Sequence, residues 1–425
     1  MVYHRPIFEL VRQRLLELPK RIQILAGPRQ IGKTTLVRQL LAQRPAQSAM
    51  YLSADEPVQD VADWSHPASG SVAWGGNRLP DRAWLVEKWQ QAAVSAQAWQ
   101  RSEKMLASQV PFVLVIDEIQ KISQWSEVIK GLWDRGVADE LPMHVVLLGS
   151  SPLLMHKGIT ESLAGRFEVL RMAHWSFEEM NAAFGFSLDQ YIYFGGFPGS
   201  APYVVDESRW RAYVALGLIQ PNIERDILQM TRIDKPALLK QLFELGCNYS
   251  GQIVSLDKML GQLSDAGNVT TLARYLELLG EAGLLTGLQK HSDKALRRRN
   301  SPPKFQTLNN ALTSAQGSHS FDEARADRSH WGHLVESAIG AHLCNTAASD
   351  TRIHYWREAS LEVDFVIEHR GRLAAIEVKG GKLAGARRGL DEFVRRHPGC
   401  QIWVVGSDAL PVGEFLRHSP EHWLD

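Results

Sequence analysis

Cysteine and long apolar runs are both scarce in this sequence. Its 425 residues include only three cysteines, Cys247, Cys344 and Cys400, which lie far apart and form no CxxC pair. This usage argues against a disulfide framework and a cysteine-ligated zinc site, and it fits a reducing cytoplasm. The longest clean apolar run, residues 110–116, is far shorter than the ~20 residues of a membrane-spanning helix. We therefore expect no membrane partner. The first residues show no apolar segment followed by small residues, so no signal peptide is expected.

A net charge of one sign is also lacking. Lysine plus arginine and aspartate plus glutamate number 47 each, so the formal net charge is zero. This balance excludes a strongly basic nucleic-acid coat protein and an acidic tail protein, although it allows local patches. One basic patch covers residues 1–44, and a second runs over 294–304 and ends at Lys304. Either could face a polyanion, but a solvated surface is the simpler interpretation of each.

The length predicts two to three domains. In residues 1–185, helical patterns alternate with short apolar strands, which is typical of an α/β fold with a parallel sheet and crossover helices on both faces. The expected strands lie at 21–26, 50–53, 112–116 and 145–148.

Residues 62–110 interrupt this alternation and are interpreted as an insertion between two strands. The second half of the insertion, 82–107, reads as one long helix. A partner-binding surface is one interpretation, but aromatic side chains more often pack in a core. The segment contains five tryptophans, Trp64, Trp74, Trp84, Trp89 and Trp99.

Three further regions are expected after a boundary at residue 185, which lies just before a Gly/Pro-rich break at 191–202. Three short helical patterns and a strand over 284–289 predict a winged helix-turn-helix, with 270–279 as its recognition helix. Thr270, Thr271, Arg274 and Tyr275 would then be available to read DNA. The competing interpretation is that this module only packs. The expected regions are a helical and winged-helix segment (186–300), a linker (301–330) and a C-terminal α/β domain (331–425).

A phosphate-binding loop is the clearest motif. Residues 27–34, GPRQIGKT, fit G-x-x-x-x-G-K-[ST], and they follow a predicted strand and open a predicted helix. Glycines allow the backbone N–H groups to cradle phosphate, and the start of the helix adds positive potential. Lys33 is expected to reach the β- and γ-phosphates of ATP, and the Thr34 hydroxyl to bind Mg²⁺. The predicted nucleotide-binding residues are Gly27, Pro28, Arg29, Gln30, Ile31, Gly32, Lys33, Thr34 and Thr35.

An acidic pair completes this predicted site. The apolar run at 113–116 ends in Asp117 and Glu118. Asp117 is expected to join the Mg²⁺ shell and Glu118 to polarise the attacking water. By itself, such a pair would more simply mark a strand that ends at the surface; the upstream loop favours catalysis.

Together, GPRQIGKTT, LVIDEIQ, LLGSS, LAGRFEVL, GGFP, EVDFVI and IEVK resemble the AAA ATPases of bacteria and archaea that carry a C-terminal domain of poorly defined function. The resemblance covers nearly the whole chain except the tryptophan-rich insertion. It implies an AAA-type ATPase over 1–185, with Ser150 (or Ser151) as a polar sensor near the γ-phosphate. It also makes Arg166 a candidate transition-state arginine, acting in cis or from a neighbouring subunit of a homo-oligomer. A structural salt bridge is the alternative role for Arg166.

A second charged constellation lies in the C-terminal region. Glu336 falls in a helical stretch, Asp364 in a strand, and Glu377 and Lys379 in the next strand. Strand residues two apart point to one face, so Glu377 and Lys379 project together. The pattern looks like the PD-(D/E)xK nuclease motif. That resemblance implies a second divalent metal at Asp364 and Glu377, with Lys379 acting on water and Glu336 supporting the metal shell. A half-buried strand with a solvated face is the alternative.

Three hypotheses follow. The first is an ATP-hydrolysing switch coupled to DNA or a protein partner, and the second is an ATP-regulated, metal-dependent DNA nuclease. The third is a nucleotide-binding scaffold with negligible turnover that docks a partner through the tryptophan-rich insertion. The intact set of Lys33, Thr34, Asp117 and Glu118 argues against the inert scaffold and favours an ATPase.

Overall fold

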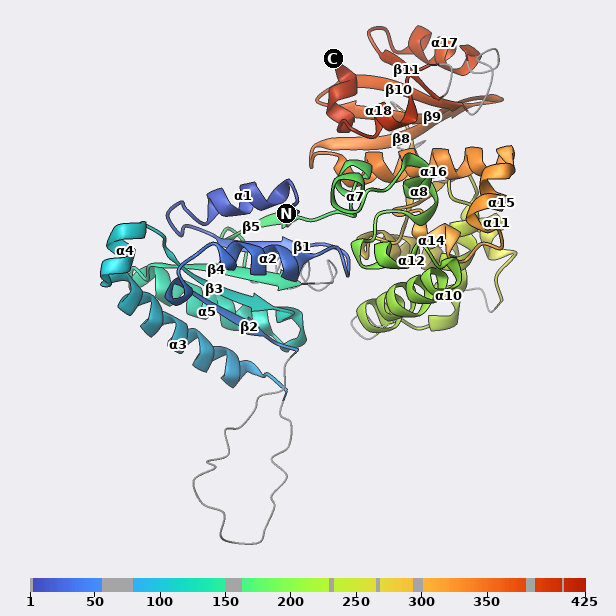
Figure 1. The fold of residues 1–425 in the computed structure, drawn as a ribbon. Coiled ribbons are helices and arrows are strands. Elements are labelled where there is room, and N and C mark those ends of the chain that lie inside the picture. Colours follow the sequence, from blue (N-terminus) through green and yellow to red (C-terminus); the bar gives the residue numbers. More distant parts are fainter. Residues whose placement is uncertain are drawn as a thin grey trace, which may run out of the picture. The chain divides into compact units, whose positions relative to one another are not determined.

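The computed structural model divides the chain into two compact units (Figure 1). The first unit consists of Met1–Gly27 and Gly32–Met172, and the second consists of Pro28–Ile31 and Ala173–Asp425. The first unit thus ends at Met172, before the boundary expected at 185. The structure describes residues 3–55, 79–149, 163–228, 233–264, 268–292, 301–379, 387–406 and 409–425.

A five-stranded parallel sheet forms the centre of the first unit. Its strand order is β2-β3-β4-β1-β5, so the first strand lies between the fourth and the fifth. Four of these strands were predicted from the sequence, whereas β5 was not, because charged Glu168 and Arg171 interrupt its apolar pattern. The strands are β1 (Ile22–Ala26), β2 (Ala49–Ser53), β3 (Phe112–Asp117), β4 (Met143–Gly149) and β5 (Phe167–Arg171). The expected parallel α/β fold is confirmed.

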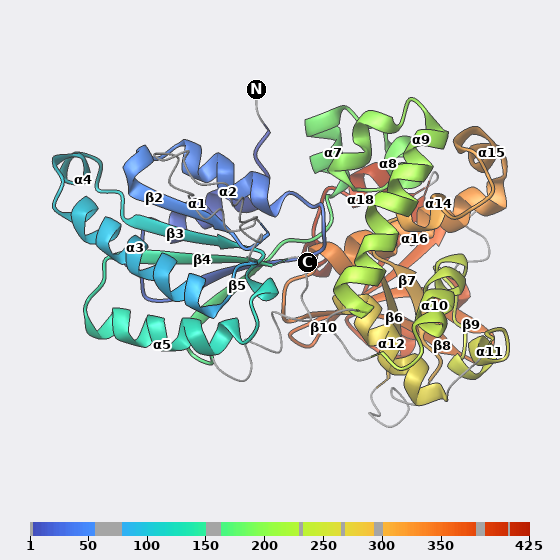
Figure 2. The same ribbon diagram turned by 90° about the horizontal axis from the view of Figure 1, so that it is seen from below.

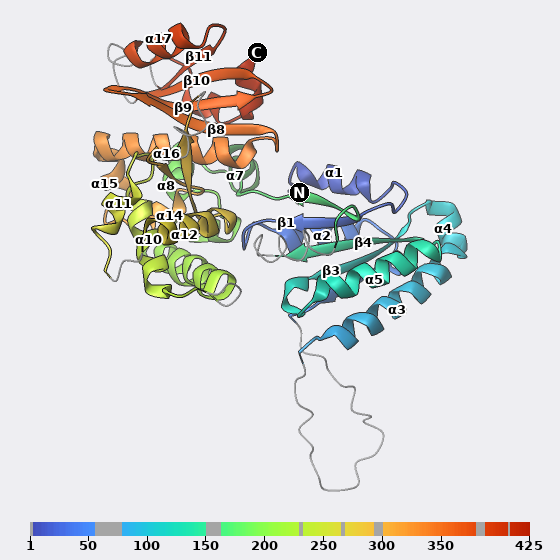
Figure 3. The same cartoon turned by 180° about the vertical axis from the view of Figure 1, so that it is seen from behind.

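Helices cover both faces of this sheet. α1 and α2 lie on one side and α3 and α5 on the other (Figures 1 and 3). α3 and α5 run side by side and contact each other (Figure 2). The helices are α1 (Ile7–Arg14), α2 (Lys33–Ala42), α3 (Arg82–Gln100), α4 (Glu103–Ser108) and α5 (Trp125–Ala138).

The helical half of the tryptophan-rich segment belongs to the core. Along α3, Leu85, Trp89, Ala92, Ala96 and Trp99 are buried at helical spacing and join the cluster that includes strand residues of β1, β3 and β4. The indole N–H of Trp99 donates to the carbonyl of Val110 at 2.8 Å. The idea that these tryptophans form a docking surface is therefore wrong for Trp89 and Trp99. Trp64 and Trp74 lie outside the described residues.

The second unit begins with helical segments and ends in a mixed α/β region. No helix in the described part of either unit has the length and apolar character that a bilayer crossing requires. The α-helices that the structure describes in the second unit are α7 (Phe177–Phe184), α8 (Leu188–Phe194), α9 (Glu207–Ala212), α10 (Pro236–Asn248), α11 (Leu256–Leu260), α12 (Val269–Glu281), α14 (Ala311–Ser314), α15 (Phe321–Ala326), α16 (Arg328–Thr346), α17 (Arg387–Arg396) and α18 (Val412–Phe415).

A six-stranded mixed sheet organises this unit, in the order β11-β10-β9-β8-β6-β7. α16 lies on one face and α17 on the other (Figure 3). Phe393 of α17 packs with Trp356, Val363 and Val366 of the sheet. The strands are β6 (Leu285–Lys290), β7 (Lys304–Thr307), β8 (Thr351–Glu358), β9 (Leu361–His369), β10 (Arg372–Lys379) and β11 (Gln401–Gly406).

The expectation of a linker over 301–330 is wrong. This segment contains β7, α14 and α15, and all four residues of β7 are buried. β7 pairs antiparallel with β6, and β6 pairs parallel with β8. The polar composition of 301–330 suggested a linker, but polar side chains such as Gln306 and Thr307 form hydrogen bonds inside the fold.

Candidate functional site

The phosphate-binding loop connects a buried strand to the start of a helix. Every residue of β1 is buried, and α2 begins at Lys33 directly after the loop. Gly32 caps the helix with φ of 90°, and Gln30 also has a left-handed φ of 59°. Glycine adopts this conformation without strain, and alternation of left- and right-handed residues turns successive N–H groups toward an anion. The loop therefore has the backbone shape that the motif predicts.

The side chain of Lys33, at the end of the loop, reaches back to the first residue of the loop. This side chain is buried, and its ammonium donates to the carbonyl oxygen of Gly27 at 2.8 Å. The charged end of the lysine is thus held beside the loop backbone, where a phosphate oxygen would be a stronger acceptor than a neutral carbonyl.

Asp117, at the end of β3, is held by three donors. The hydroxyls of Thr34 and Tyr51 each donate to its Oδ2 at 2.7 Å, and the backbone N–H of Glu118 donates to Oδ1 at 2.9 Å. Burial, reinforced by the Asp117 carboxylate, raises the pKa of Tyr51. Tyr51 was not predicted from the sequence. Its position one strand away from Asp117 follows from the pairing of β2 with β3, which only the sheet order reveals.

Glu118 follows in an unusual backbone conformation. Its φ is 54°, in the left-handed region that costs a non-glycine residue of order 1 kcal/mol or more. Its Oε2 accepts a hydrogen bond from the side-chain amide of Gln120 at 2.6 Å. Strained backbone of this kind is often retained at functional sites, and the amide of Gln120 fixes the direction of the carboxylate.

The remaining two predicted residues of the first unit have different outcomes. Ser150, like Ser151, lies outside the described residues. Arg166 precedes β5, and the parallel pairing of Ile22 with Phe167 places it at the amino ends of the strands. The phosphate loop follows Ala26 at the opposite, carboxyl ends.

Arg166 instead makes a salt bridge. Its Nε and Nη2 donate to the two carboxylate oxygens of Asp134 at 2.6 and 3.0 Å. This corrects the cis interpretation, because Arg166 does not lie beside the phosphate loop of its own chain. The structural salt bridge that the sequence left open is the one observed.

The four predicted residues of the C-terminal cluster come together. Glu336 lies on α16, Asp364 on β9, and Glu377 and Lys379 on β10. β9 and β10 are antiparallel neighbours, and Asp364 Oδ2 accepts from the backbone N–H of Val378 at 2.8 Å. The ammonium of Lys379 lies 2.9 Å from Glu377 Oε1.

A fifth residue, Lys304 of β7, joins this cluster beside Glu336 and Asp364. Its side chain is fully buried, and its ammonium lies 2.6 Å from Glu336 Oε1 and 3.7 Å from Asp364 Oδ1. Although burial opposes the charge of Lys304, the carboxylates of Asp364 and Glu336 raise its pKa. The prediction that Lys304 belongs to a basic run at the surface is wrong. A phenylalanine directly after it, Phe305, was the available signal of a buried strand.

Burial also shifts the pKa values of two acids in this cluster. It raises the pKa of Glu336 to about 7, and with the charge of Asp364 it raises the pKa of Glu377 to about 7. Among the described residues, the three acids of this cluster do not bring one oxygen each to within 4.8 Å of one another. The ammonium of Lys304 lies instead between two of them, Glu336 and Asp364.

The expected recognition helix exists as α12. Thr270 and Arg274 are exposed on it, and Thr271 is half-buried. Tyr275 is buried, and its hydroxyl accepts a hydrogen bond from the backbone N–H of Lys235 at 3.1 Å. Tyr275 is therefore a packing residue and is not available to a ligand at the surface.

Models of three families match successive parts of the chain. An AAA domain matches residues 19–70 and 83–181. A domain of unknown function, DUF8612, matches 185–321, and another, DUF4143, matches 331–415.

The relatives found by sequence span most of the chain. An uncharacterized protein of Mycobacterium tuberculosis is 25% identical over 387 residues, which are 89% of this chain and 74% of that protein. One of Haemophilus influenzae is 22% identical over 371 residues, or 84% and 82% of the two chains. Among solved structures, a Walker-type ATPase of Pyrococcus abyssi has a TM-score of 0.49 at 16% identity, covering 74% of this chain and 96% of that one. The matched family model and the phosphate loop together identify residues 19–181 as a P-loop ATPase domain of the AAA type, followed by two domains of unknown function.

Proposed function

We propose that this protein is an ATP-hydrolysing switch, in which nucleotide state controls binding of DNA or a protein partner by the remaining domains. The contact between the Thr34 hydroxyl and the Asp117 carboxylate, 2.7 Å long, is the observation that carries this proposal. It joins the start of α2 to the end of β3, as an NTPase site requires. The reducing cytoplasm expected from the cysteine usage suits such a protein, and Cys247, Cys344 and Cys400 are free thiols.

The donor atoms at this site fit a hydrated Mg²⁺ ion. Hydroxyl and carboxylate oxygens are the hard ligands that Mg²⁺ prefers, and Thr34 and Asp117 bring one of each together. When bound, Mg²⁺ would neutralise phosphate charge. The protein residues would do the rest: Lys33 would exchange the carbonyl of Gly27 for a phosphate oxygen, and Glu118 would accept a proton from the attacking water.

Nucleotide binding and phosphate release, measured on the full chain, test this proposal. We expect Lys33→Ala to lose tight ATP binding and turnover together. Lys20→Ala, at an exposed lysine of the same unit, is the matched control and should behave as wild type. Wild-type protein that neither binds nor hydrolyses ATP with Mg²⁺ would overturn the proposal.

The proposal also includes DNA binding that depends on the bound nucleotide. The order α10, α11, α12, β6 and β7 supports a winged-helix arrangement, and the exposed face of α12 carries Thr270 and Arg274. We expect Arg274→Ala to weaken binding of duplex DNA, and ATP and ADP to give different affinities. A DNA affinity that is equal in wild type and Arg274→Ala would remove this face from the interface.

A metal-dependent nuclease is the second candidate, favoured by the convergence of Glu336, Asp364, Glu377 and Lys379. Lys304 weighs against it, because its ammonium already neutralises Glu336 and Asp364. We therefore rank recognition above cleavage. Plasmid cleavage with Mg²⁺ or Mn²⁺ that disappears in Asp364→Ala would reverse that order.

A further inference from the structure

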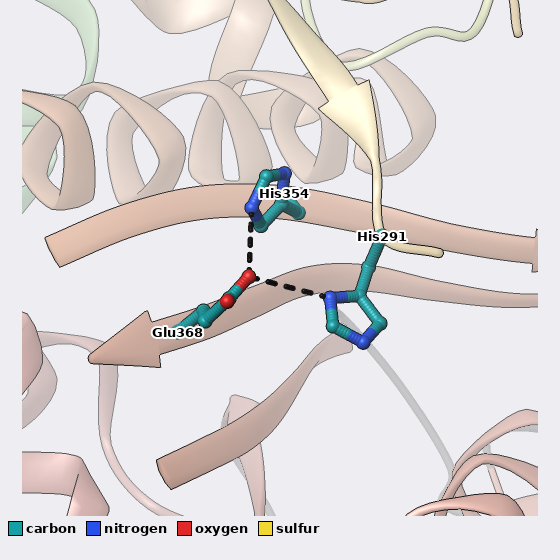
Figure 4. Close-up of side chains that lie close together, drawn as sticks. All are labelled: His291, His354 and Glu368. Atoms are coloured by element: carbon teal, nitrogen blue, oxygen red, sulfur yellow. Dashed lines mark ion pairs between the residues drawn. The ribbon is translucent and has the colours of Figure 1, made fainter. Parts of the chain in front are cut away.

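A second cluster of potential metal ligands lies on the same sheet, apart from the carboxylates around Lys304. His291 directly follows β6, His354 lies on β8, and Glu368 lies on β9 (Figure 4). The ligand atoms of the three side chains all lie within 4.8 Å of one another. We propose that His291, His354 and Glu368 form a Zn²⁺ site that fastens β6 to β8 and β9.

The strand pairing explains why these side chains meet. His354 pairs with Val366, so Glu368, two residues further along β9, points to the same face. The backbone N–H of His291 donates to the carbonyl of Tyr355 at 2.6 Å, which holds the end of β6 against β8. Three separate strand segments thus deliver one side chain each to a single point.

Both imidazoles face the same carboxylate oxygen. Nε2 of His354 lies 3.3 Å and Nδ1 of His291 lies 3.8 Å from Oε2 of Glu368. That oxygen is buried and accepts no hydrogen bond from any residue that the structure describes. A proton on one imidazole would serve only one of the two contacts, and protonating both would place two buried positive charges side by side. One bound cation could be ligated by all three side chains at once.

The surroundings favour a metal ion in that place. Nδ1 of His354 lies 3.3 Å from the carbonyl oxygen of Gln289, an arrangement in which Nδ1–H faces the carbonyl and the Nε2 lone pair faces Glu368. Metal-ligating histidines usually have such a backbone partner on their second nitrogen. The side chains of His291 and His354 are only 6% and 5% exposed, which protects their contacts from water.

Ligand type and spacing favour zinc. Imidazole nitrogen and carboxylate oxygen suit Zn²⁺, whose tetrahedral ligands at ~2.0–2.1 Å lie ~3.3 Å apart. The 3.3 Å separation of His354 and Glu368 matches this value, and the 3.8 Å separation of His291 and Glu368 exceeds it by 0.5 Å. Octahedral ions with similar bond lengths would need ~3.0 Å between neighbouring ligands. The fourth position is left to water.

Zinc titration of the full chain, without nucleotide and after removal of metals by a chelator, tests this proposal. In competition with a chromophoric chelator, we expect one Zn²⁺ per chain, a rise in Tm on zinc addition, and a tetrahedral visible spectrum with Co²⁺. His354→Gln and Glu368→Gln should each weaken zinc binding at least ~10-fold.

Two neighbouring variants serve as matched controls. His369→Gln changes the histidine next to Glu368, which contacts Thr351 and Asp350 instead, and Asp364→Asn changes the carboxylate cluster on the same strand. Both should keep wild-type zinc affinity. Absence of stoichiometric zinc binding by wild type, or equal binding by His354→Gln and Glu368→Gln, would overturn the proposal. If those variants fail to fold, the wild-type Tm shift and Co²⁺ spectrum remain decisive.

Discussion

The ammonium nitrogen of Lys304 lies 2.6 Å from Oε1 of Glu336, although the two residues come from β7 and α16. The side chain of Lys304 is fully buried and that of Glu336 is 18% exposed. Such a pair contributes little to the free energy of unfolding when it is compared with a pair of apolar residues. Removal of one partner, however, leaves a buried charge uncompensated.

We therefore expect Lys304→Met to lower the free energy of unfolding by about 3–5 kcal/mol. Adding Glu336→Gln should recover part of the loss, since the orphaned acid is then neutral. Lys240→Met is the control, because the pair of Lys240 with Glu224 is exposed and should contribute at most about 1 kcal/mol. Urea unfolding of Lys304→Met, of the double variant and of Lys240→Met measures these free energies. A loss for Lys304→Met no larger than the control would contradict a charged lysine at this position.

Glu118→Gln should separate binding from hydrolysis. Because the amide can still accept and donate hydrogen bonds but is a far weaker base, we expect ATP affinity to remain and turnover to fall by about 100-fold or more. Gln120→Ala should lower kcat by a smaller factor without changing KM, since Gln120 orients Glu118. Steady-state kinetics measures turnover, and equilibrium binding measures ATP affinity. Unchanged turnover in Glu118→Gln would assign the base elsewhere.

Arg166 should not be needed by the nucleotide site of its own chain. It pairs with Asp134 at the strand ends opposite the phosphate loop, so we expect Arg166→Ala and Asp134→Ala to have equal effects on turnover, within about twofold of wild type. The alternative is an arginine supplied by a neighbouring subunit of a homo-oligomer. In that case Arg166→Ala alone would lose activity, and mixing it with Lys33→Ala chains would restore turnover.

Acid should destabilise the second unit through His342 of α16. Burial lowers the pKa of His342 to about 4, and its Nε2 lies 2.8 Å from the carbonyl oxygen of His418. The native state keeps this imidazole neutral while the unfolded chain takes up a proton below its ordinary pKa of 6.5. The free energy of unfolding is therefore unaffected by this histidine above pH 6.5. It falls by on the order of 3 kcal/mol as the pH is lowered from 6.5 toward 4.

His342→Gln should flatten this part of the stability curve, because glutamine does not titrate. Chemical unfolding at several pH values between 4 and 7 gives the slope. Burial lowers the pKa of His144 in the first unit as well, so the difference between variant and wild type is the relevant quantity. His333→Gln, at an exposed position of the same helix, is the control. Parallel curves for His342→Gln and wild type would contradict the prediction.

The nucleotide site could be read from the sequence because its residues are local to two motifs. A glycine-rich turn after a buried strand sets the shape of residues 27–34, and an apolar strand sets the position of Asp117. Tyr51 could not be predicted in the same way, because its contact with Asp117 depends on which strand lies beside β3. The AAA topology places β2 there, and no local pattern in residues 49–53 indicates it.

Long-range pairing also explains the other omissions. Lys304 looked like a member of a surface basic run, and only the pairing of β7 with β6 places it inside the fold. His291, His354 and Glu368 are separated by many residues and match no ligand spacing. Their meeting point depends on the register of β8 with β9 and on the parallel alignment of β6.

The position of β6 and β7 has a practical consequence for any attempt to study the C-terminal region alone. The match to DUF4143 begins at residue 331, but two strands of its sheet are supplied by residues 285–290 and 304–307, within the match to DUF8612. A fragment that started at 331 would lose Lys304 and His291 and expose the bare edge of β8, inviting aggregation. The two matched regions should therefore unfold in one cooperative step, and their evolutionary boundary does not mark a place where the polypeptide can be cut.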